Sequence, residues 1–397
     1  MKVAIINTVI GTGSVGRIAK GTADEIIKNG GEALLCRGRG GELPGYDNYR
    51  VGSDLDMFCH GIMTRITDKH GLYSKNATRG LIRKLEAYDP DVIQLHNIHG
   101  YYVNYPELFK WLKTCGKPVV WTLHDCWSFT GHCVHYEYCG CEKWEKAECA
   151  DCPEKSEYPA SYVRDFSKGN IARKKECFTG VPKLQLVTPS EWLKKAAERS
   201  ILAEYPVQVI NTGIDPDTFK PVSTDLRQRY DIGDRILLLG VANPWRERKG
   251  LYEFVALHEK LEQEYPGKYR IALVGLKSSQ MAELPEGIIK TGHTESVEEL
   301  AAWYSAADFY VNLTFGDTFP TTNIEALACG TPVITYDAGG SGEMLNDKVG
   351  AVVSQGDLDA VIRATEQLKG ELPCREQAMR YAGQAKYREY YELYQKI

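Results

Sequence analysis

The sequence contains no run of eighteen apolar residues and no large excess of charge of either sign. A transmembrane helix needs about twenty consecutive apolar residues, so we expect no segment to span a membrane. The net charge of −5 does not favour nucleic acid as a partner. A hydrophobic content of 43% and a charged content of 25% exclude a disordered or collagen-like chain. At 397 residues, the chain is long enough for two globular domains.

The first residues, MKVAIINTVIGTG, combine one lysine with a short apolar run. This pattern predicts a buried strand, because a secretory signal would need a longer apolar core and a small-residue cleavage site. We therefore expect a cytoplasmic protein, whose thiols stay reduced. A peripheral position on the inner face of the cell membrane is the alternative to free solution.

Short β-rich runs alternate with longer helical patterns along the whole chain. Strand patterns occupy 2–7, 92–95, 119–123 and 184–187, and then 235–242, 270–275, 308–313 and 331–336. Helical patterns occupy 15–29, 251–265, 296–306, 320–329, 355–369 and 375–396. Such alternation predicts parallel sheets covered by helices on both faces. Two such series predict an α/β chain with two doubly wound, Rossmann-like domains.

The expected boundary between these domains lies in VINTGIDPDTFKP, which is rich in Gly, Pro and Asp. We predict one domain at 1–208, with a cysteine-rich insertion at 126–160, and a second at 209–374. The tyrosine-rich end, 375–397, is expected to be a helix that packs back across the seam. Ligands of doubly wound sheets bind at the carboxyl ends of the strands, so we expect a cleft there.

The segment FGDTFPTTNIEALACGTPVITYDAGGSGE (315–343) predicts a strand, a turn and a helix that begins near Pro320. Three residues then offer backbone N–H groups at the helix N-terminus: Thr321, Thr322 and Asn323. Such a terminus favours a phosphate or sugar oxygen. Asp317 and Glu325 flank it, and one carboxylate can accept two vicinal hydroxyls of a sugar or ribose. A surface helix with acidic ends is the alternative.

This segment resembles the E-x7-E region of the retaining glycosyltransferases of family 4, which have the GT-B fold. The resemblance implies that Glu325 holds the ribose of a nucleotide sugar, and that Asp317 and the 319–323 amides hold the transferred sugar. The implied donor-binding residues here are Phe319, Pro320, Thr321, Thr322, Asn323 and Glu325. Asp317 stands where Glu is usual, and FPTTN stands where residues like FGLV are usual. Both departures affect the sugar subsite, so the identity of the sugar does not carry over.

Two further loops resemble parts of the same family, and a third loop agrees with it. GVANPWRERKG (240–250) is similar to its G-R-x-x-x-K-G loop, which implies Arg248 and Lys249 on the diphosphate. Such cations stabilise a departing nucleoside diphosphate, although the loop alone would also suit a solvated basic turn. TGHTES, with His293, resembles the loop that holds the base through its main chain. GTGSVGR, with Gly13, lets backbone approach an anion but would equally suit a dinucleotide fold.

Histidines mark the ends of two predicted strands in the first half of the chain. DVIQLHNIHGYYVN (91–104) places His96 and His99 after one strand, and TLHD places His124 and Asp125 after the next. The resemblance puts His96 where the family has a histidine that contacts the transferring sugar. His99, His124 and Asp125 are candidates for the acceptor side, which the resemblance assigns to the first domain. A single histidine is more often structural, but this grouping favours a site.

Six of the twelve cysteines lie between residues 126 and 152. Reduced thiols at C-x-x-C spacing favour structural zinc, which takes four ligands. Related family members carry a similar insertion, and this resemblance selects Cys133, Cys141, Cys149 and Cys152. Cys141 is preferred to Cys139 because a C-x-x-W match includes Trp144. Disulfides and a catalytic thiol are the alternatives, and no cofactor is expected for catalysis itself.

The segment RITDKHGLYSKNATRGLIRK (65–84) carries six basic residues and one aspartate. One interpretation is contact with an anionic membrane surface or with a lipid-linked pyrophosphate. A solvated helix face is the alternative.

These patterns together predict a retaining GT-B glycosyltransferase. It would move a sugar from a UDP- or GDP-sugar to a hydroxyl of a glycan or a polyprenyl-diphosphate-linked acceptor, in surface polysaccharide biosynthesis. The predicted catalytic residues are His96, Asp317 and Glu325. A nucleotide-sugar epimerase of the same fold is one alternative. A non-catalytic sugar-binding protein is another, but it would leave Arg248 and Lys249 without a role.

Overall fold

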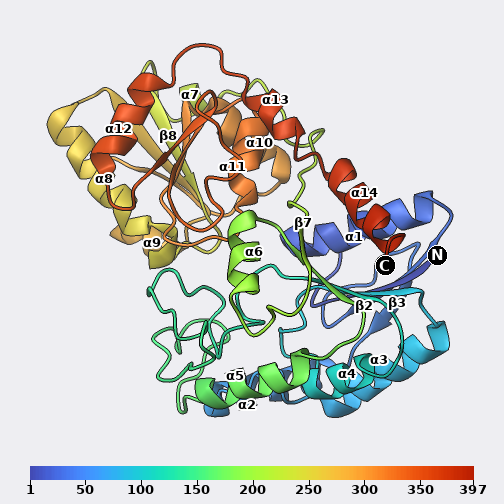
Figure 1. Cartoon of the computed structure of the whole chain (residues 1–397). Coiled ribbons are helices and arrows are strands. Elements are labelled where there is room, and N and C mark those ends of the chain that lie inside the picture. The colour runs from blue at the N-terminus through green and yellow to red at the C-terminus, as the bar shows by residue number, and fades with distance from the viewer. The chain divides into compact units, whose positions relative to one another are not determined.

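The computed structural model describes residues 1–397, which form two compact units (Figure 1). Unit 1 comprises Met1–Thr212 and Gln384–Ile397, and unit 2 comprises Gly213–Gly383. The division thus falls a few residues after the predicted boundary at 208. The predicted third segment, 375–397, does not stand alone, because the division at 383/384 splits it between the two units.

Unit 1 contains a seven-stranded parallel sheet in the order β3-β2-β1-β4-β5-β6-β7. Its strands are β1 (Lys2–Asn7), β2 (Glu32–Arg37), β3 (Asp47–Arg50), β4 (Val92–Leu95), β5 (Val119–Thr122), β6 (Leu184–Thr188) and β7 (Val207–Val209). In the centre of the sheet, Val3 of β1 lies opposite Ala33 of β2 and Val92 of β4. The central strands are apolar throughout because both faces of the sheet are covered.

Helices cover both faces of this sheet. They are α1 (Gly13–Lys28), α2 (Asp54–Thr67), α3 (Lys75–Tyr88), α4 (Tyr105–Leu112), α5 (Ser167–Phe178), α6 (Glu191–Glu198) and α14 (Gly383–Tyr394). Alternate residues of β1 enter different cores: Ala4 packs with α3 and α4, whereas Ile5 packs with α1 and α14. The helices α2 to α5 lie together along one side of the sheet (Figure 1).

The cysteine-rich insertion between β5 and α5 has no helix or strand, yet it has a core of its own. Trp144 is 1% exposed, and its ring lies 5.1 Å from that of Phe129 and 4.7 Å from that of Tyr136. These aromatic contacts hold a long irregular segment in one conformation.

A buried ion pair joins the insertion to α2. His132 Nδ1 lies 2.5 Å from Asp68 Oδ1, and both side chains are fully buried. Asp68 ends α2 in a left-handed conformation, and its second carboxylate oxygen accepts a hydrogen bond from Phe166 N at 2.8 Å. Burial alone would lower the pKa of His132, but the hydrogen bond and charge of Asp68 raise it.

Unit 2 contains a six-stranded parallel sheet in the order β10-β9-β8-β11-β12-β13. Its strands are β8 (Ile236–Val241), β9 (Tyr269–Val274), β10 (Ile289–Thr291), β11 (Phe309–Asn312), β12 (Val333–Tyr336) and β13 (Gly350–Val353). Its helices are α7 (Leu226–Arg229), η1 (Glu247–Lys249), α8 (Leu251–Glu264), α9 (Ser278–Glu283), α10 (Val297–Ala306), α11 (Thr321–Ala328), α12 (Leu358–Gln367) and α13 (Cys374–Met379). Leu237 of β8 packs with α10 and α11, and Leu238 packs with α8 and α12.

The predicted fold class, two doubly wound parallel sheets, is confirmed. Five strands were not among those predicted: β2, β3, β7, β10 and β13. The single helix predicted at 375–396 is wrong, because α13 and α14 are separate helices. Ile214 explains the break: it forms a β-bridge with Ala382 and exchanges backbone hydrogen bonds with Tyr381 and Gly383. No helix is both long and apolar enough to cross a lipid bilayer.

The His132–Asp68 pair predicts a pH dependence of stability. Because the folded-state pKa of His132 is raised, its contribution is fully present below the unfolded-state value of about 6.5. The contribution is lost as pH rises through the folded-state pKa. We therefore expect the free energy of unfolding of wild-type protein to exceed that of His132→Gln most at acidic pH, with the gap narrowing towards alkaline pH.

Chemical denaturation followed across a pH series would measure this gap. His293→Gln is the control, because that histidine is exposed in a loop of unit 2. A gap between wild type and His132→Gln that stays constant with pH would contradict a protonated His132 in the folded state.

Candidate functional site

Two loops of unit 2 meet at the carboxyl ends of the neighbouring strands β8 and β11. The turn η1 follows β8, and the loop 313–320 follows β11. Arg248 O accepts two hydrogen bonds from the second loop, one from Phe315 N at 2.8 Å and one from Thr314 Oγ1 at 3.2 Å. The motif at 240–250 is therefore held directly against the motif at 315–343.

Gly250 permits this close approach. It has φ +75°, and a Cβ atom at this position would collide with the carbonyl oxygen of Leu313. Only glycine meets both demands without strain. Gly250 thus allows Arg248 and Lys249, which precede it in the loop, to lie at the carboxyl end of β11.

Lys249 and Asp317 form an ion pair, with Nζ 2.5 Å from Oδ2. They are 68 positions apart in the sequence and come from the two separate motifs. Both are largely but not fully buried, with side chains 26% and 17% exposed. The neighbouring Arg248 guanidinium donates to Gly316 O. The lysine ammonium has three N–H donors, so it can bind Asp317 and another anion together.

Glu325 lies in α11 and is only 5% exposed. Its Oε2 accepts a hydrogen bond from the hydroxyl of Tyr304 in α10 at 3.2 Å. Burial, and then the charge of Glu325, raise the pKa of Tyr304, so this hydroxyl stays protonated and donates. Tyr304 was not predicted, because a tyrosine inside a helical pattern has no sequence signal that distinguishes it from a core residue.

Two of the predicted donor-binding side chains have packing roles. Asn323 is fully buried: it donates to Ser341 O at 2.8 Å and accepts from Asn312 Nδ2 at 2.8 Å. Phe319 is 5% exposed, and its ring lies 5.8 Å from that of Tyr381. These side chains hold the loops around α11 in place and do not extend into solvent.

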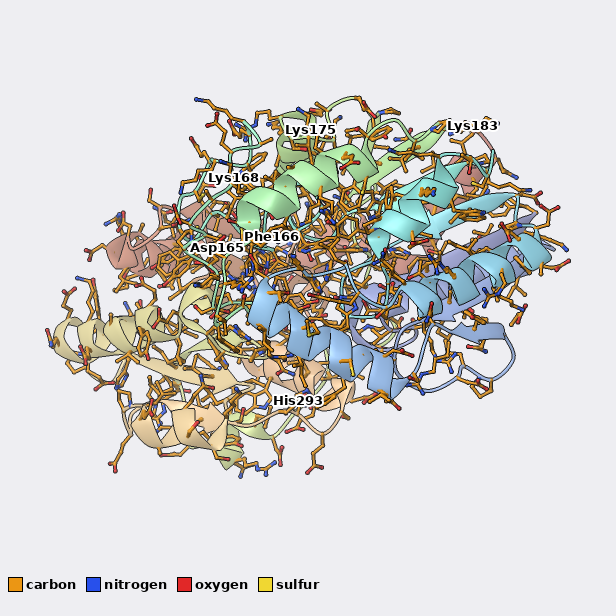
Figure 2. The ribbon with its side chains drawn as sticks, turned by 90° about the horizontal axis from the view of Figure 1, so that it is seen from below. Asp165, Phe166, Lys168, Lys175, Lys183 and His293 are labelled. Carbon is orange, nitrogen blue, oxygen red and sulfur yellow. The ribbon has the colours of Figure 1, made fainter.

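The remaining predicted donor residues are spread over both units. Pro320 is the N-cap of α11, and Thr321 and Thr322 are its first residues, whose N–H groups have no partner within the helix. His293 is exposed in the loop after β10, with Nδ1 2.7 Å from Thr294 O (Figure 2). Gly13 begins α1 of unit 1 with φ +66°. Unit 2 therefore joins Lys249 and Asp317 in an ion pair, while the hydrogen bond recorded for His293 is to its neighbour Thr294.

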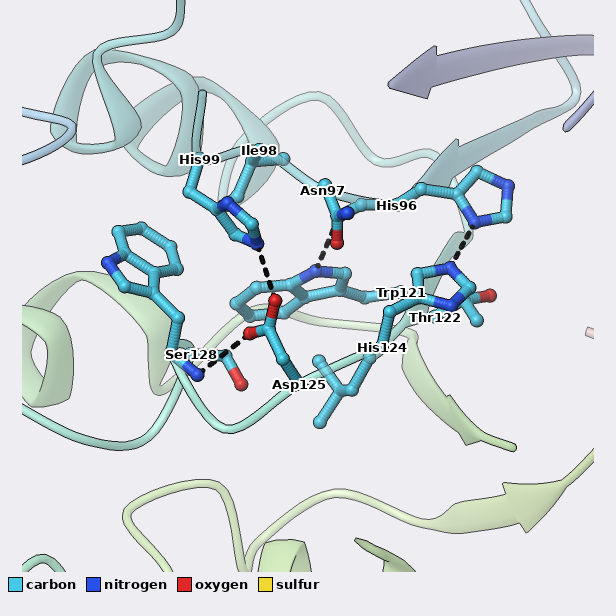
Figure 3. A pocket seen from close by; sticks show the side chains of 11 residues that line it. His96, Asn97, Ile98, His99, Trp121, Thr122, His124, Asp125 and Ser128 are labelled. Carbon is cyan, nitrogen blue, oxygen red and sulfur yellow. Dashed lines mark hydrogen bonds and ion pairs between the residues drawn. The ribbon is translucent and has the colours of Figure 1, made fainter. Parts of the chain in front are cut away.

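In unit 1, His96 and His124 follow the neighbouring strands β4 and β5 (Figure 3). His96 Nδ1 lies 3.0 Å from His124 Nε2, and the two rings stack with their centroids 5.2 Å apart. Burial lowers the pKa of His124 to about 4, and burial and then His124 lower the pKa of His96 well below its usual value. Both imidazoles are therefore neutral near pH 7, so one ring donates and the other accepts.

His99 and Asp125 form a second pair at the same strand ends (Figure 3). His99 Nε2 lies 2.9 Å from Asp125 Oδ2, and Asp125 Oδ1 accepts from Trp127 N at 2.9 Å. Burial by itself would raise the pKa of Asp125. The charge interaction and hydrogen bond with His99, together with the Trp127 N–H, outweigh it and bring the pKa to about 2. Asp125 is thus an ionised carboxylate that orients His99.

The cysteine-rich insertion contributes to this histidine cluster. His99 Nδ1 lies 3.1 Å from the hydroxyl of Tyr158, and its ring lies 5.2 Å from that of Trp127. Neither aromatic residue was predicted, because nothing in the local pattern of the insertion links it to the strand ends. The cavity among these side chains is about 10 Å³, room for about one water molecule, so the cluster is not a preformed sugar pocket.

The predicted zinc ligands are only partly brought together. A hydrogen bond with the Cys133 thiol lowers the pKa of Cys152, and Cys149 Sγ accepts from Gly131 N at 3.2 Å. None of the twelve cysteines forms a disulfide, and no three His, Cys, Asp or Glu residues form a metal-ligand set. The structure therefore does not assemble the four-thiolate set that includes Cys141, and structural zinc stays a prediction.

Two family models match the chain, one in each half. The model described as Glycosyltransferase Family 4 matches residues 15–218, which is more than half of the chain. The model described as Glycosyl transferases group 1 matches residues 233–370, which contain the whole second sheet.

One similar protein is named as a colanic acid biosynthesis glycosyl transferase, WcaC of Escherichia coli K12. It is 26% identical over 329 residues, which are 78% of this chain and 77% of that protein. Sucrose-phosphate synthase from Thermosynechococcus elongatus superposes with a TM-score of 0.70 at 16% identity, covering 100% of this chain and 98% of that one. The Anabaena protein HepE, in complex with UDP-glucose, superposes with a TM-score of 0.66 at 14% identity, covering 100% of both chains.

The structural likenesses concern the fold, which is the GT-B fold expected from the sequence. The family model supports the family as well as the fold, because its match over residues 15–218 includes His96, His99 and the cysteine-rich insertion. The chain belongs to glycosyltransferase family 4.

Proposed function

We propose that the protein transfers a sugar, with retention of configuration, from a UDP- or GDP-sugar to a hydroxyl of a glycan or a polyprenyl-diphosphate-linked acceptor in surface polysaccharide biosynthesis. The Lys249–Asp317 pair at the N-terminus of α11 is the observation that carries this proposal. It combines a cation, a carboxylate and free helix N–H groups, which suit a sugar diphosphate. The name of the WcaC relative and the UDP-glucose bound to HepE favour the same donor and product classes.

In this proposal, unit 2 holds the donor. Lys249 and Arg248 bind the diphosphate, and the N–H groups of Thr321 and Thr322 face its oxygens or those of the sugar. Glu325 accepts hydrogen bonds from the ribose hydroxyls while Tyr304 holds its other oxygen. Asp317 accepts from the transferred sugar through its carboxylate, which also forms the ion pair with Lys249.

The proposed reaction needs no covalent nucleophile from the protein. The bond between the sugar and the phosphate breaks, and the acceptor oxygen forms the new bond on the same face of the sugar. The acceptor proton passes to an oxygen of the departing diphosphate. Lys249 and Arg248 stabilise the negative charge that develops there, which is where fixed cations accelerate such a step most.

Unit 1 supplies the acceptor side. We assign His99, oriented by Asp125, to an acceptor hydroxyl. His96 is neutral and buried, and its Nε2 has no hydrogen-bond partner within the protein. His96 Nε2 can therefore donate a hydrogen bond to a hydroxyl of the transferred sugar, or accept one from it, while charge develops on the sugar during the reaction.

The donor assignment predicts a large effect of Lys249→Ala. Loss of the ammonium should lower kcat/KM by about 100-fold or more, because one fixed charge at a developing anion is removed. The affinity for the nucleoside diphosphate, measured by calorimetry, should fall in parallel. Lys260→Ala is the matched control, since Lys260 forms a lysine–carboxylate pair with Glu264 at 2.7 Å on an exposed helix of the same unit. Normal turnover of Lys249→Ala would refute the assignment.

The same assay separates the two alternative functions. The protein should be incubated with UDP- and GDP-sugars, with and without lipid-linked acceptors. Release of an altered nucleotide sugar without acceptor would indicate an epimerase. Tight nucleotide-sugar binding with no turnover under any condition would indicate a sugar-binding protein.

The acceptor-side assignment predicts the behaviour of Asp125→Asn. An amide keeps the shape of the side chain but cannot hold His99 by charge, so we expect kcat to fall by about 100-fold. Affinity for the nucleoside diphosphate should stay within about twofold, because the proposed diphosphate contacts come from unit 2. Asp89→Asn, which removes an exposed carboxylate paired with Lys117, is the control. Equal losses of kcat and nucleotide affinity would show a general structural defect instead.

The zinc prediction is decided by metal content. If four thiolates bind zinc, purified protein should contain about one zinc per chain, and Cys152→Ser should lose it. Cys139→Ser should keep the metal if Cys141 is the fourth ligand. Metal-free protein with twelve titratable thiols would agree with the absence of disulfides in the structure and would refute the zinc hypothesis.

A further inference from the structure

Helix α2 presents an apolar face to solvent. Five large hydrophobic side chains on it are exposed: Leu55 (69%), Phe58 (64%), Ile62 (39%), Met63 (38%) and Ile66 (43%). They recur at intervals of three and four residues, so they form one continuous stripe along the helix. Burying such a stripe releases apolar surface from water, which is the main favourable term in association.

The buried face of α2 is polar in comparison. Its buried residues are His60, Gly61 and Thr64, and Met57 is partly buried against the core. His60 is held there by Ser74 Oγ at 2.8 Å and by Gly71 N at 3.0 Å. An ordinary surface helix has the opposite polarity, with its apolar stripe facing the core.

A loop of the cysteine-rich insertion enlarges this apolar surface. Tyr162 and Val163 are 66% and 65% exposed. Tyr162 N donates to Arg65 O at 2.8 Å, which places the loop beside the last turn of α2. We call the seven exposed residues on these two segments the α2 patch: Leu55, Phe58, Ile62, Met63, Ile66, Tyr162 and Val163. Contiguous apolar patches of this kind mark interaction sites on soluble proteins.

The acidic groups around the α2 patch are engaged by the protein itself. Asp54 pairs with Arg50, and Asp56 accepts from Ser53 N at 2.8 Å. Asp165 accepts hydrogen bonds from two backbone N–H groups of its own segment at 2.7 and 2.8 Å. Asp68, at the end of α2, is buried against His132.

Basic groups beside the α2 patch point into solvent. Arg164 follows Val163 directly, and Lys168 lies in the first turn of α5 (Figure 2). Both are exposed, and neither has a carboxylate within ion-pair distance. Arg65 is also exposed, with its guanidinium over the Tyr101 ring at 5.7 Å. The local surface is therefore apolar along the helix and cationic at its carboxyl-terminal end.

We infer that the α2 patch docks the protein on an anionic lipid bilayer. An amphipathic helix with an apolar face and a basic flank lies in the membrane interface, with its apolar side chains among the acyl chains. Anionic headgroups attract the basic flank and so strengthen the binding of the apolar face.

A membrane contact was predicted for the whole segment 65–84, whereas the α2 patch includes only the start of that segment. The structure divides that segment between α2, a loop and α3. Arg79 pairs with Glu107 at 3.2 Å and Lys84 with Asp47 at 3.6 Å, so these two cations already have partners. The inference deepens the proposed function and rests on it in one respect, since a polyprenyl-linked acceptor is presented at a membrane.

Flotation of the full chain with vesicles tests the inference. Vesicles of equal parts phosphatidylcholine and phosphatidylglycerol should carry the wild-type protein to the top of the gradient. The double variant Phe58→Ser/Ile62→Ser should lower the vesicle partition coefficient about tenfold or more, because two large apolar side chains are lost from the interface. Both positions are exposed, so the melting temperature should not change.

The matched controls are Tyr252→Ser and Ile27→Ser, which remove side chains of 62% and 44% exposure from α8 and α1. Neither should alter flotation. Arg164→Gln/Lys168→Gln should weaken binding to the anionic vesicles several-fold and leave the weaker binding to pure phosphatidylcholine unchanged. That result would establish the charge contribution separately from the apolar one.

Two results would overturn the inference. One is flotation of Phe58→Ser/Ile62→Ser equal to wild type. The other is a wild-type dimer in light scattering that this variant converts to a monomer, with no vesicle binding by either. Transfer to a water-soluble acceptor analogue reports on the proposed function independently. Wild-type protein that transfers sugar to the soluble acceptor but does not bind vesicles would contradict the membrane inference alone. Protein that binds vesicles but does not transfer sugar to the soluble acceptor would contradict the proposed function alone.

Discussion

In both units the strands of the sheet are all parallel, so within a unit every strand ends at the same edge. This constraint brings together side chains that are far apart in the sequence. His96 and His124 meet because β4 and β5 are neighbours, and Lys249 meets Asp317 because β8 and β11 are neighbours. An antiparallel pair at either place would send one of the two loops to the opposite edge. The chemistry of each unit therefore depends on the direction of its strands.

Buried tyrosine hydroxyls contact candidate residues in each of the two units. Tyr304 donates to Glu325 in unit 2, and Tyr158 lies within hydrogen-bond distance of His99 in unit 1. A buried carboxylate or imidazole without such a partner would cost several kcal/mol, and its orientation would not be determined. Burial also raises the pKa of each tyrosine, which keeps the hydroxyl protonated. The groups proposed to bind sugars are thus positioned by residues that need not contact the ligand.

The cysteine-rich insertion links three parts of unit 1. His132 pairs with Asp68 at the end of α2, and Tyr158 reaches the histidine cluster. Tyr162 extends the apolar surface of α2. A segment without a helix or strand can do this because its own aromatic core around Trp144 keeps it in one conformation. The insertion thus lies between the surface inferred to meet the bilayer and the side chains assigned to the acceptor.

The sequence by itself determined the fold class and the central strands, because periodicity is a local property. It also supplied most of the candidate residues through their positions at predicted strand ends, and their roles stay predictions. Helix α2 was not among the predicted helices, and its apolar stripe by itself would not show whether it faces the core or solvent. The sequence also did not distinguish Asn323, whose side chain is buried, from Thr321 and Thr322 beside it. The Lys249–Asp317 pair, the two tyrosine partners and the break between α13 and α14 were decided by tertiary structure. Each depends on contacts between segments far apart in the chain, whose distances are set only when the sheets form.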